Sequence, residues 1–124
     1  MIIDNIRNKR EFKRLYKECG GQLKNKKLPQ ILTLFDLKSA FAFYDEVDNT
    51  LCGCIYVETI DNKVFLSGFS RRKNYKDNIR AVEVVCDYLK QDVYSRTPYK
   101  EAALVLKKAG FKHLQDDIYI KEVA

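Results

Sequence analysis

The 124-residue sequence predicts an α/β (α+β) fold, with a single mixed, mostly antiparallel sheet of about seven strands flanked by helices. Three runs rich in β-branched and aromatic residues follow one another between residues 40 and 69, separated by short turn signals. Amphipathic helical stripes precede and follow these runs. A hydrophobic content of 46% is sufficient for one compact domain over residues 1–124.

The N-terminal region predicts a strand followed by a helix. A short strand over Ile2–Ile6 leads to a capping box that begins at Asn8, and Gly20-Gly21 ends the helix. Residues 22–38 predict a short second helix or turn and then an apolar segment. The apolar residues with helical spacing are Phe12, Leu15, Tyr16 and Cys19.

The centre of the chain predicts an antiparallel meander of three strands. Asp48-Asn49 supplies the first turn, and Asp61-Asn62 is a strong signal for a tight hairpin. The predicted strands are Ala40–Glu46, Leu51–Thr59 and Lys63–Phe69.

A basic segment, Arg71–Arg80, leads from the meander into the next predicted helix. Asn74 and Asp77 have the spacing of a capping box. The helix has an apolar stripe, and a phosphate-binding segment often occupies such a place between a strand and a helix. The stripe consists of Ile79, Val82, Cys86 and Leu89, with Val85 beside it.

The C-terminal region predicts a strand, a helix and a hairpin. Asp92–Ser95 forms the strand, and Thr97-Pro98 supplies the N-cap and first residue of a helix that ends at Gly110. The last hairpin joins Phe111–Gln115 to Ile118–Lys121.

Composition excludes several functional classes. Residues 1–30 carry nine basic and three acidic side chains (9 − 3 = +6), which equals the net charge of the whole chain. Because aromatic residues are not interleaved with these charges, we expect a solvated helix face and not a nucleic-acid surface. The chain lacks a long apolar run, and its N-terminus is too charged for a secretory signal, so we expect a cytoplasmic protein without a membrane span.

The cysteines predict reduced, buried thiols and no metal site. A single histidine, His113, and the spacing of the cysteines do not fit a zinc site. The cysteines are Cys19, Cys52, Cys54 and Cys86.

The segment AALVLKKAGF (Ala102–Phe111), together with the order of elements, resembles the GNAT superfamily of acyl-CoA N-acyltransferases. In that family the segment commonly reads A-x-x-L-Y-E-K-L-G-F, and Ala102, Gly110 and Phe111 match it. The small size and the lysine- and asparagine-rich composition are similar to those of a degenerate, phage-type member. The resemblance implies an acetyl-CoA-dependent N-acetyltransferase whose acceptor is an amine of a small molecule or a protein.

The resemblance also implies where the cofactor binds. The strand end Gly68, Phe69 and Ser70 would hold the pantetheine arm. The family's pyrophosphate loop, R/Q-x-x-G-x-G/A, is in register with Tyr75–Arg80, and neither of its glycines is present. Arg80 either binds phosphate through a forked contact or blocks the groove. The residues implied for the phosphates are Arg71, Lys76, Asn78 and Arg80.

Catalytic roles follow from the same resemblance. Leu106 stands at the position of the tyrosine that protonates the leaving thiolate, and leucine cannot donate a proton. Tyr94 and Tyr99 are therefore the candidate acids. Glu58 is the candidate general base, with Glu46 and Glu83 as alternatives.

Two other functions remain open at this point. One is a catalytically inactive interaction protein on the same fold, which has lost acetyl-CoA binding and contacts a phage or host protein in the virion or the host cytoplasm. The other is a nucleic-acid binder that uses the basic N-terminal helix, which is the less favoured of the two.

Overall fold

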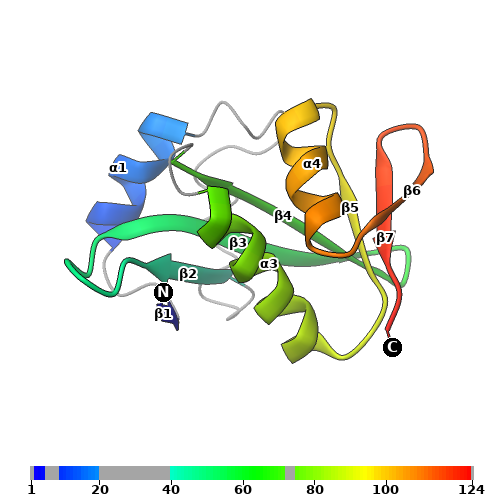
Figure 1. The fold of residues 1–124 in the computed structure, drawn as a ribbon, viewed down its shortest axis with the longest axis horizontal. Helices are drawn as coiled ribbons and strands as arrows, with labels where there is room; N and C mark the ends of the chain where they lie inside the picture. The colour runs from blue at the N-terminus through cyan, green and yellow to red at the C-terminus, as the bar shows by residue number, and fades with distance from the viewer. Residues whose placement is uncertain (1, 5–8, 20–39, 72–74, 124) are drawn as a thin grey trace. The chain divides into compact units, whose positions relative to one another are not determined.

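The computed structural model describes residues 2–4, 9–19, 40–71 and 75–123 (Figure 1). Its strands are β1 (Ile2–Asp4), β2 (Ala40–Tyr44), β3 (Leu51–Ile60), β4 (Lys63–Ser70), β5 (Val93–Arg96), β6 (Lys112–Gln115) and β7 (Ile118–Lys121). Its helices are α1 (Lys9–Cys19), α3 (Tyr75–Leu89) and α4 (Lys100–Lys108).

The seven strands form one sheet in the order β1-β2-β3-β4-β5-β7-β6, which confirms the predicted mixed sheet. β4 and β5 are parallel, whereas β1–β2, β2–β3, β5–β7 and β6–β7 are antiparallel. The chain divides into two compact units. The first unit is Met1–Tyr56 with Gly68–Asn74, and the second is Val57–Ser67 with Tyr75–Ala124.

The core of the first unit lies between α1 and the strands. Phe12 and Leu15 are fully buried, and the Phe12 and Phe69 rings lie 5.6 Å apart. This confirms the helical stripe predicted from the sequence. The N-cap at Asn8, the stop at Gly20-Gly21 and the elements predicted within residues 22–38 lie outside the described residues.

The predicted turns of the meander are confirmed. Asn49 has a φ of 61° in the turn that follows β2. Asp61 and Asn62 have φ values of 51° and 64°, and they join β3 to β4 as a two-residue turn. Two successive positive φ angles are those of a type I′ turn, whose twist matches that of the flanking strands.

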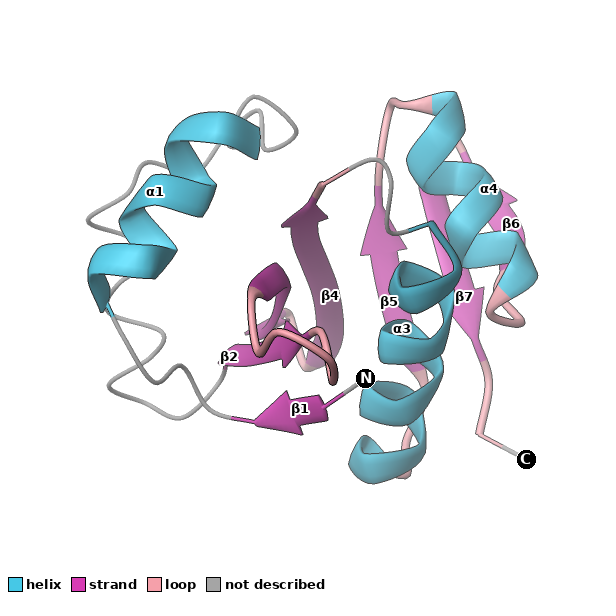
Figure 2. Ribbon diagram, turned by 60° about the vertical axis from the view of Figure 1, so that its left-hand side comes forward, coloured by secondary structure: helices cyan, strands magenta, loops and turns pink. Residues whose placement is uncertain are grey.

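In the second unit, α3 and α4 pack side by side (Figure 2). The prediction for α3 was right about Val82 and Cys86, which are buried. Val85, predicted beside the stripe, is also buried. Ile79 and Leu89 are only half-buried, and Ala81 completes the buried face.

The end of α4 is a Schellman motif. The Phe111 N–H donates to the Leu106 carbonyl at 2.9 Å, and the Gly110 N–H donates to the Lys107 carbonyl at 3.1 Å. Gly110 has a φ of 102°, which side chains disfavour and glycine accepts. Thus the Gly110-Phe111 signal is a helix stop with a physical cause, as predicted.

The start of α4 differs from the prediction. Tyr99, and not Thr97, is the N-cap, so Pro98 precedes the helix. Thr97 is engaged elsewhere: its N–H donates to the Asp117 carbonyl at 2.9 Å, and its Oγ1 accepts from the Tyr99 N–H at 3.2 Å. The threonine therefore forms a local turn fixed to the β6–β7 hairpin.

Candidate functional site

The parallel pair β4–β5 opens after two registered positions in the second unit. Val64 pairs with Val93, and Phe65 pairs with Tyr94. At the next position the buried Ser95 hydroxyl donates to the Leu66 carbonyl at 2.8 Å. A side chain therefore satisfies a carbonyl that a backbone N–H would take in a continuous ladder. The registered backbone pairing of β4 with β5 therefore ends at Phe65 and Tyr94.

The structure brings two predicted catalytic residues to one face of the sheet. The two-residue turn at Asp61-Asn62 places Ile60 opposite Lys63, and hence Glu58 opposite Phe65. Phe65 is in register with Tyr94 on the other side. Glu58, Phe65 and Tyr94 thus form a row across β3, β4 and β5, and all three are half-buried.

Tyr99 lies apart from this row. It precedes α4, beyond the end of β5, and its carbonyl accepts from the Ala103 N–H at 3.0 Å. Of the alternative bases, Glu46 is exposed in the turn after β2, and Glu83 is half-buried on α3.

Leu106 is buried, with 5% of its surface exposed. It occupies the third position from the end of α4, and its carbonyl takes part in the Schellman motif. The position implied for the family's acid is therefore occupied by a core side chain of the second unit, without a proton to donate.

Gly68 is explained by its neighbouring strand. A Cβ at this position would lie 2.5 Å from the Cys54 carbonyl oxygen and 3.4 Å from the Ile55 Cα. Glycine is therefore required by the close approach of β3. The neighbouring Phe69 is buried in the core of the first unit, so its ring is occupied by packing against Phe12 and Tyr16.

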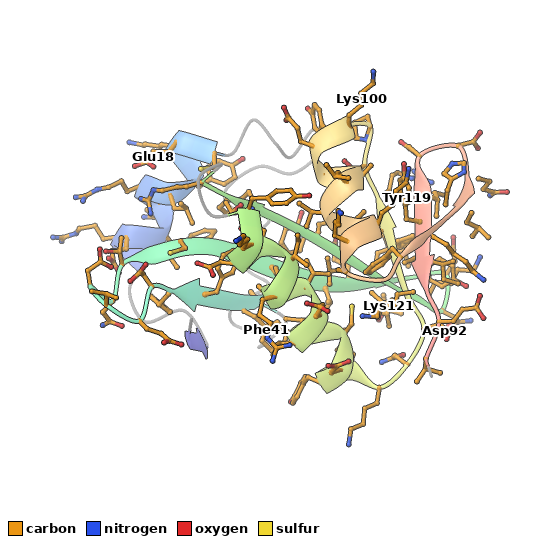
Figure 3. All side chains as sticks on the ribbon, viewed as in Figure 1. Glu18, Phe41, Asp92, Lys100, Tyr119 and Lys121 are labelled. Carbon is orange, nitrogen blue, oxygen red and sulfur yellow. The ribbon has the colours of Figure 1, made fainter. Side chains whose placement is uncertain are left out.

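Arg71 makes internal contacts with its guanidinium group. Its Nε lies 3.0 Å from Glu18 Oε2 on α1, and its Nη1 donates to the Leu51 carbonyl of β3. Its backbone N–H donates to the Cys52 carbonyl at 3.2 Å. Figure 3 shows Glu18 on α1. These contacts hold α1 to β3 within the first unit.

Lys76, Asn78 and Arg80 are helical, because α3 begins at Tyr75. Lys76 and Arg80 are exposed, and their spacing of four residues places them on one side of the helix. Two cations near a helix N-terminus are suited to a phosphate group. The half-buried Asp77 in the first turn reduces this positive potential.

Asn78 carries the one buried side-chain polar atom without a hydrogen-bond partner in the described part of the chain. This atom is Oδ1, a carbonyl oxygen. Such an acceptor needs a donor, for example an amide N–H or a hydroxyl of a bound molecule. A cofactor that carries both phosphates and amide groups fits these residues.

The four cysteines are buried, as predicted, and none of them forms a disulfide. Burial raises the pKa of Cys86 to about 11 and raises the pKa of Cys54 further. A thiolate nucleophile is therefore disfavoured at both positions. Among the described residues, no three His, Cys, Asp or Glu side chains lie together as a metal site would require. None of the described helices is both long and apolar enough to cross a membrane.

The raised pKa of Cys86 predicts a loss of stability at alkaline pH. Because the unfolded thiol ionises near pH 9 and the folded thiol near pH 11, the unfolded state binds fewer protons between these values. We expect Cys86 to lower the free energy of unfolding by about 1 to 2 kcal/mol between pH 8.5 and 10.5. Denaturant unfolding at both pH values should show a smaller loss for Cys86→Ala. Equal losses in the two proteins would contradict this.

The chain matches no family model and no curated protein. Solved structures share its fold. An N-acetyltransferase from Staphylococcus aureus Mu50 has a TM-score of 0.77 and 13% identity, over 98% of this chain and 96% of that chain. A GNAT-family acetyltransferase from Bacillus anthracis has a TM-score of 0.70 and 10% identity, over 98% of both chains.

A third solved structure contains a cofactor. The N-acetyltransferase YlbP from Bacillus subtilis, in complex with coenzyme A, has a TM-score of 0.60 and 14% identity, over 98% of this chain and 95% of that chain. At these identities the likeness concerns the fold. It confirms that the chain has the fold of GNAT N-acetyltransferases.

Proposed function

We propose that the protein is an N-acyltransferase that uses acetyl-CoA to acetylate an amine of a small molecule or a protein. The observation that carries this proposal is the opening of the β4–β5 pair, where the Ser95 hydroxyl donates a hydrogen bond to the Leu66 carbonyl. This opening leaves an edge of parallel strands to which an extended amide-containing arm can bind. The shared fold with a coenzyme A complex supports the same cofactor.

Each residue has a role in this proposal. Lys76 and Arg80 would bind phosphate groups from one side of α3, and Asn78 Oδ1 would accept a hydrogen bond from the cofactor. When bound, the cofactor would supply a thioester whose carbonyl carbon the amine attacks and whose thiolate leaves.

Two residues of the row on the sheet face, Glu58 and Tyr94, would accept and donate protons. Glu58 would take the proton that an ammonium group must lose before its nitrogen can attack. Tyr94 would hold a phenolic proton on the same face, and Tyr99 stays the alternative acid. The contacts of Gly68, Phe69, Ser70 and Arg71 with the pantetheine and phosphates stay predictions.

Calorimetric titration with acetyl-CoA tests the cofactor. We expect saturable binding that Arg80→Gly weakens about tenfold or more, because a charge-assisted hydrogen bond to phosphate is lost. Lys107→Ala, which removes an exposed cation from α4, is the matched control and should bind as the parent does. Absence of binding at millimolar acetyl-CoA would refute the proposal, and tighter binding by Arg80→Gly would show that Arg80 blocks the site.

The buried Leu106 favours a second function, a catalytically inactive interaction protein on the same fold. This protein would contact a phage or host protein, and a cytoplasmic or virion location belongs to the same hypothesis. Incubation with acetyl-CoA and a panel of primary amines, followed by mass spectrometry, separates the two functions. Detection of an acetylated amine would refute the hypothesis that the protein is catalytically inactive.

A further inference from the structure

The second unit holds an ammonium ion over an aromatic ring. Lys63 Nζ lies 5.4 Å from the centroid of the Tyr94 ring. This distance is within the range of about 6 Å at which a cation is attracted to the negative face of an aromatic ring. In the described part of the chain no carboxylate forms an ion pair with Lys63. The Tyr94 ring is thus the group with which this ammonium interacts.

A second ring adjoins the first. Phe65 and Tyr94 have centroids 5.6 Å apart and are inclined at 43°. Both side chains are half-buried, whereas Lys63 is exposed. Two adjoining rings present aromatic faces that attract a cation and apolar surface that an aliphatic stem can cover.

A carboxylate completes the row. Glu58 lies opposite Phe65 across the two-residue turn, so that the aromatic pair has Glu58 on one side. Neighbouring strands are about 4.8 Å apart, which places Glu58 about 10 Å from Tyr94, measured between backbones. An alkylammonium ion of a few carbons can therefore place its charge between the Tyr94 ring and the Glu58 carboxylate while its stem contacts Phe65.

The face that carries the row is not the face against α4 in this unit. Tyr94 is in register with Ile120, whereas the neighbouring Val93 is in register with Lys121. Lys121 Nζ donates to the Ala109 carbonyl at the end of α4, at 2.7 Å. Because side chains alternate along a strand, the Val93–Lys121 face is the one that α4 covers.

We propose that Glu58, Phe65 and Tyr94 form a binding site for a primary alkylammonium ion, and that Lys63 occupies this site when no ligand is present. Lysine carries the same chemical group, so its ammonium competes with the ligand for the ring. The ligand's role as the acetyl acceptor rests on the proposed function, but its binding does not. This narrows the acceptor class to amines with a flexible aliphatic stem, such as a lysine side chain or a linear alkyl amine.

Titration of the full chain with n-pentylammonium, followed by the NMR signals of the aromatic rings and in the absence of coenzyme A, tests the site. We expect 1-pentanol, which lacks the charge, to bind at least about tenfold more weakly. Lys63→Met keeps the aliphatic stem but removes the competing ammonium, and it should bind n-pentylammonium more tightly than the parent. Equal binding of the two ligands, or unchanged binding by Lys63→Met, would overturn the proposal.

Two further variants separate the ring from the fold. Tyr94→Phe keeps an aromatic face and should retain binding, whereas Tyr94→Leu should lose it. Tyr119→Leu is the matched control, because Tyr119 is in register with Ser95, the neighbour of Tyr94, and therefore lies on the other face of the sheet. Loss of binding in Tyr119→Leu, or full binding in Tyr94→Leu, would contradict the site.

The outcomes are distinguishable from those of the cofactor experiment. Alkylammonium binding without acetyl-CoA binding would refute the proposed transferase function but not the proposed alkylammonium site. Acetyl-CoA binding without alkylammonium binding would refute this site alone.

Discussion

Gly68→Ala is expected to lower the free energy of unfolding by about 3 kcal/mol, because the added methyl group would overlap the Cys54 carbonyl oxygen of the neighbouring strand. The Cys54 carbonyl oxygen and the Ile55 Cα are backbone atoms of β3, and they cannot rotate away as a side chain can. The strands must separate to admit the methyl group, which would weaken both the hydrogen bonds between them and the packing of the first unit.

Chemical denaturation of Gly68→Ala beside Ser67→Ala measures this effect. Ser67 precedes Gly68 on β4 and is half-buried, so its alanine variant controls for a change in strand propensity. We expect the Ser67 variant to differ from the parent by less than about 1 kcal/mol. If Gly68→Ala were as stable as the parent, the explanation that Gly68 is required by the close approach of β3 would be contradicted.

Arg71→Ala is expected to cost about 2 kcal/mol, because the guanidinium group donates to the Leu51 carbonyl and pairs with Glu18. Removal of the arginine leaves a carbonyl without its charged donor and releases α1 from β3.

Arg96→Ala provides the matched control for Arg71→Ala. Arg96 also pairs with a carboxylate, Asp117, at 3.5 Å, but 63% of its side chain is exposed. Exposed pairs contribute little, and we expect a change below about 0.5 kcal/mol. A loss of acetyl-CoA binding in Arg71→Ala, without a loss of stability, would assign this arginine to the cofactor instead of the fold.

Much of the fold could be predicted from the sequence because its signals are local. Asp61-Asn62 determines both a turn and the register of two strands, and Gly110 ends α4 through its own backbone conformation. The N-cap of α4 was predicted wrongly. Thr97 has the chemistry of a cap, but its backbone bonds to Asp117, which is distant in sequence, and this contact could not be foreseen.

The candidate site was predicted less completely for the same reason. Glu58 was predicted as the base and Tyr94 as a candidate acid, but the position of Phe65 between them was not predicted. The signal was present in part, since the two-residue turn already pairs Glu58 with Phe65. Phe65 and Tyr94 pair between two parallel strands that are connected through α3. The register of such a pair is not determined by a local turn, so it could not be predicted from the sequence.

Arg71 and Ser95 illustrate the remaining limits. Arg71 belongs to a basic segment that suggested phosphate binding, whereas its guanidinium contacts Glu18 at a sequence separation of 53 residues. Ser95 was predicted only as the end of a strand. Its role depends on the point at which β5 departs from β4, a property of three-dimensional packing.

The position of β7 between β5 and β6 has a consequence for biosynthesis. β5 pairs with β7 over all four of its residues, yet Ile118 is translated well after Arg96. At about 5 to 20 residues per second, the 22 residues from Arg96 to Ile118 take about 1 to 4 s to synthesise, and β5 cannot pair with β7 before they are made. An unpaired edge can join the wrong chain, so the second unit is most vulnerable to aggregation just before its last strand emerges.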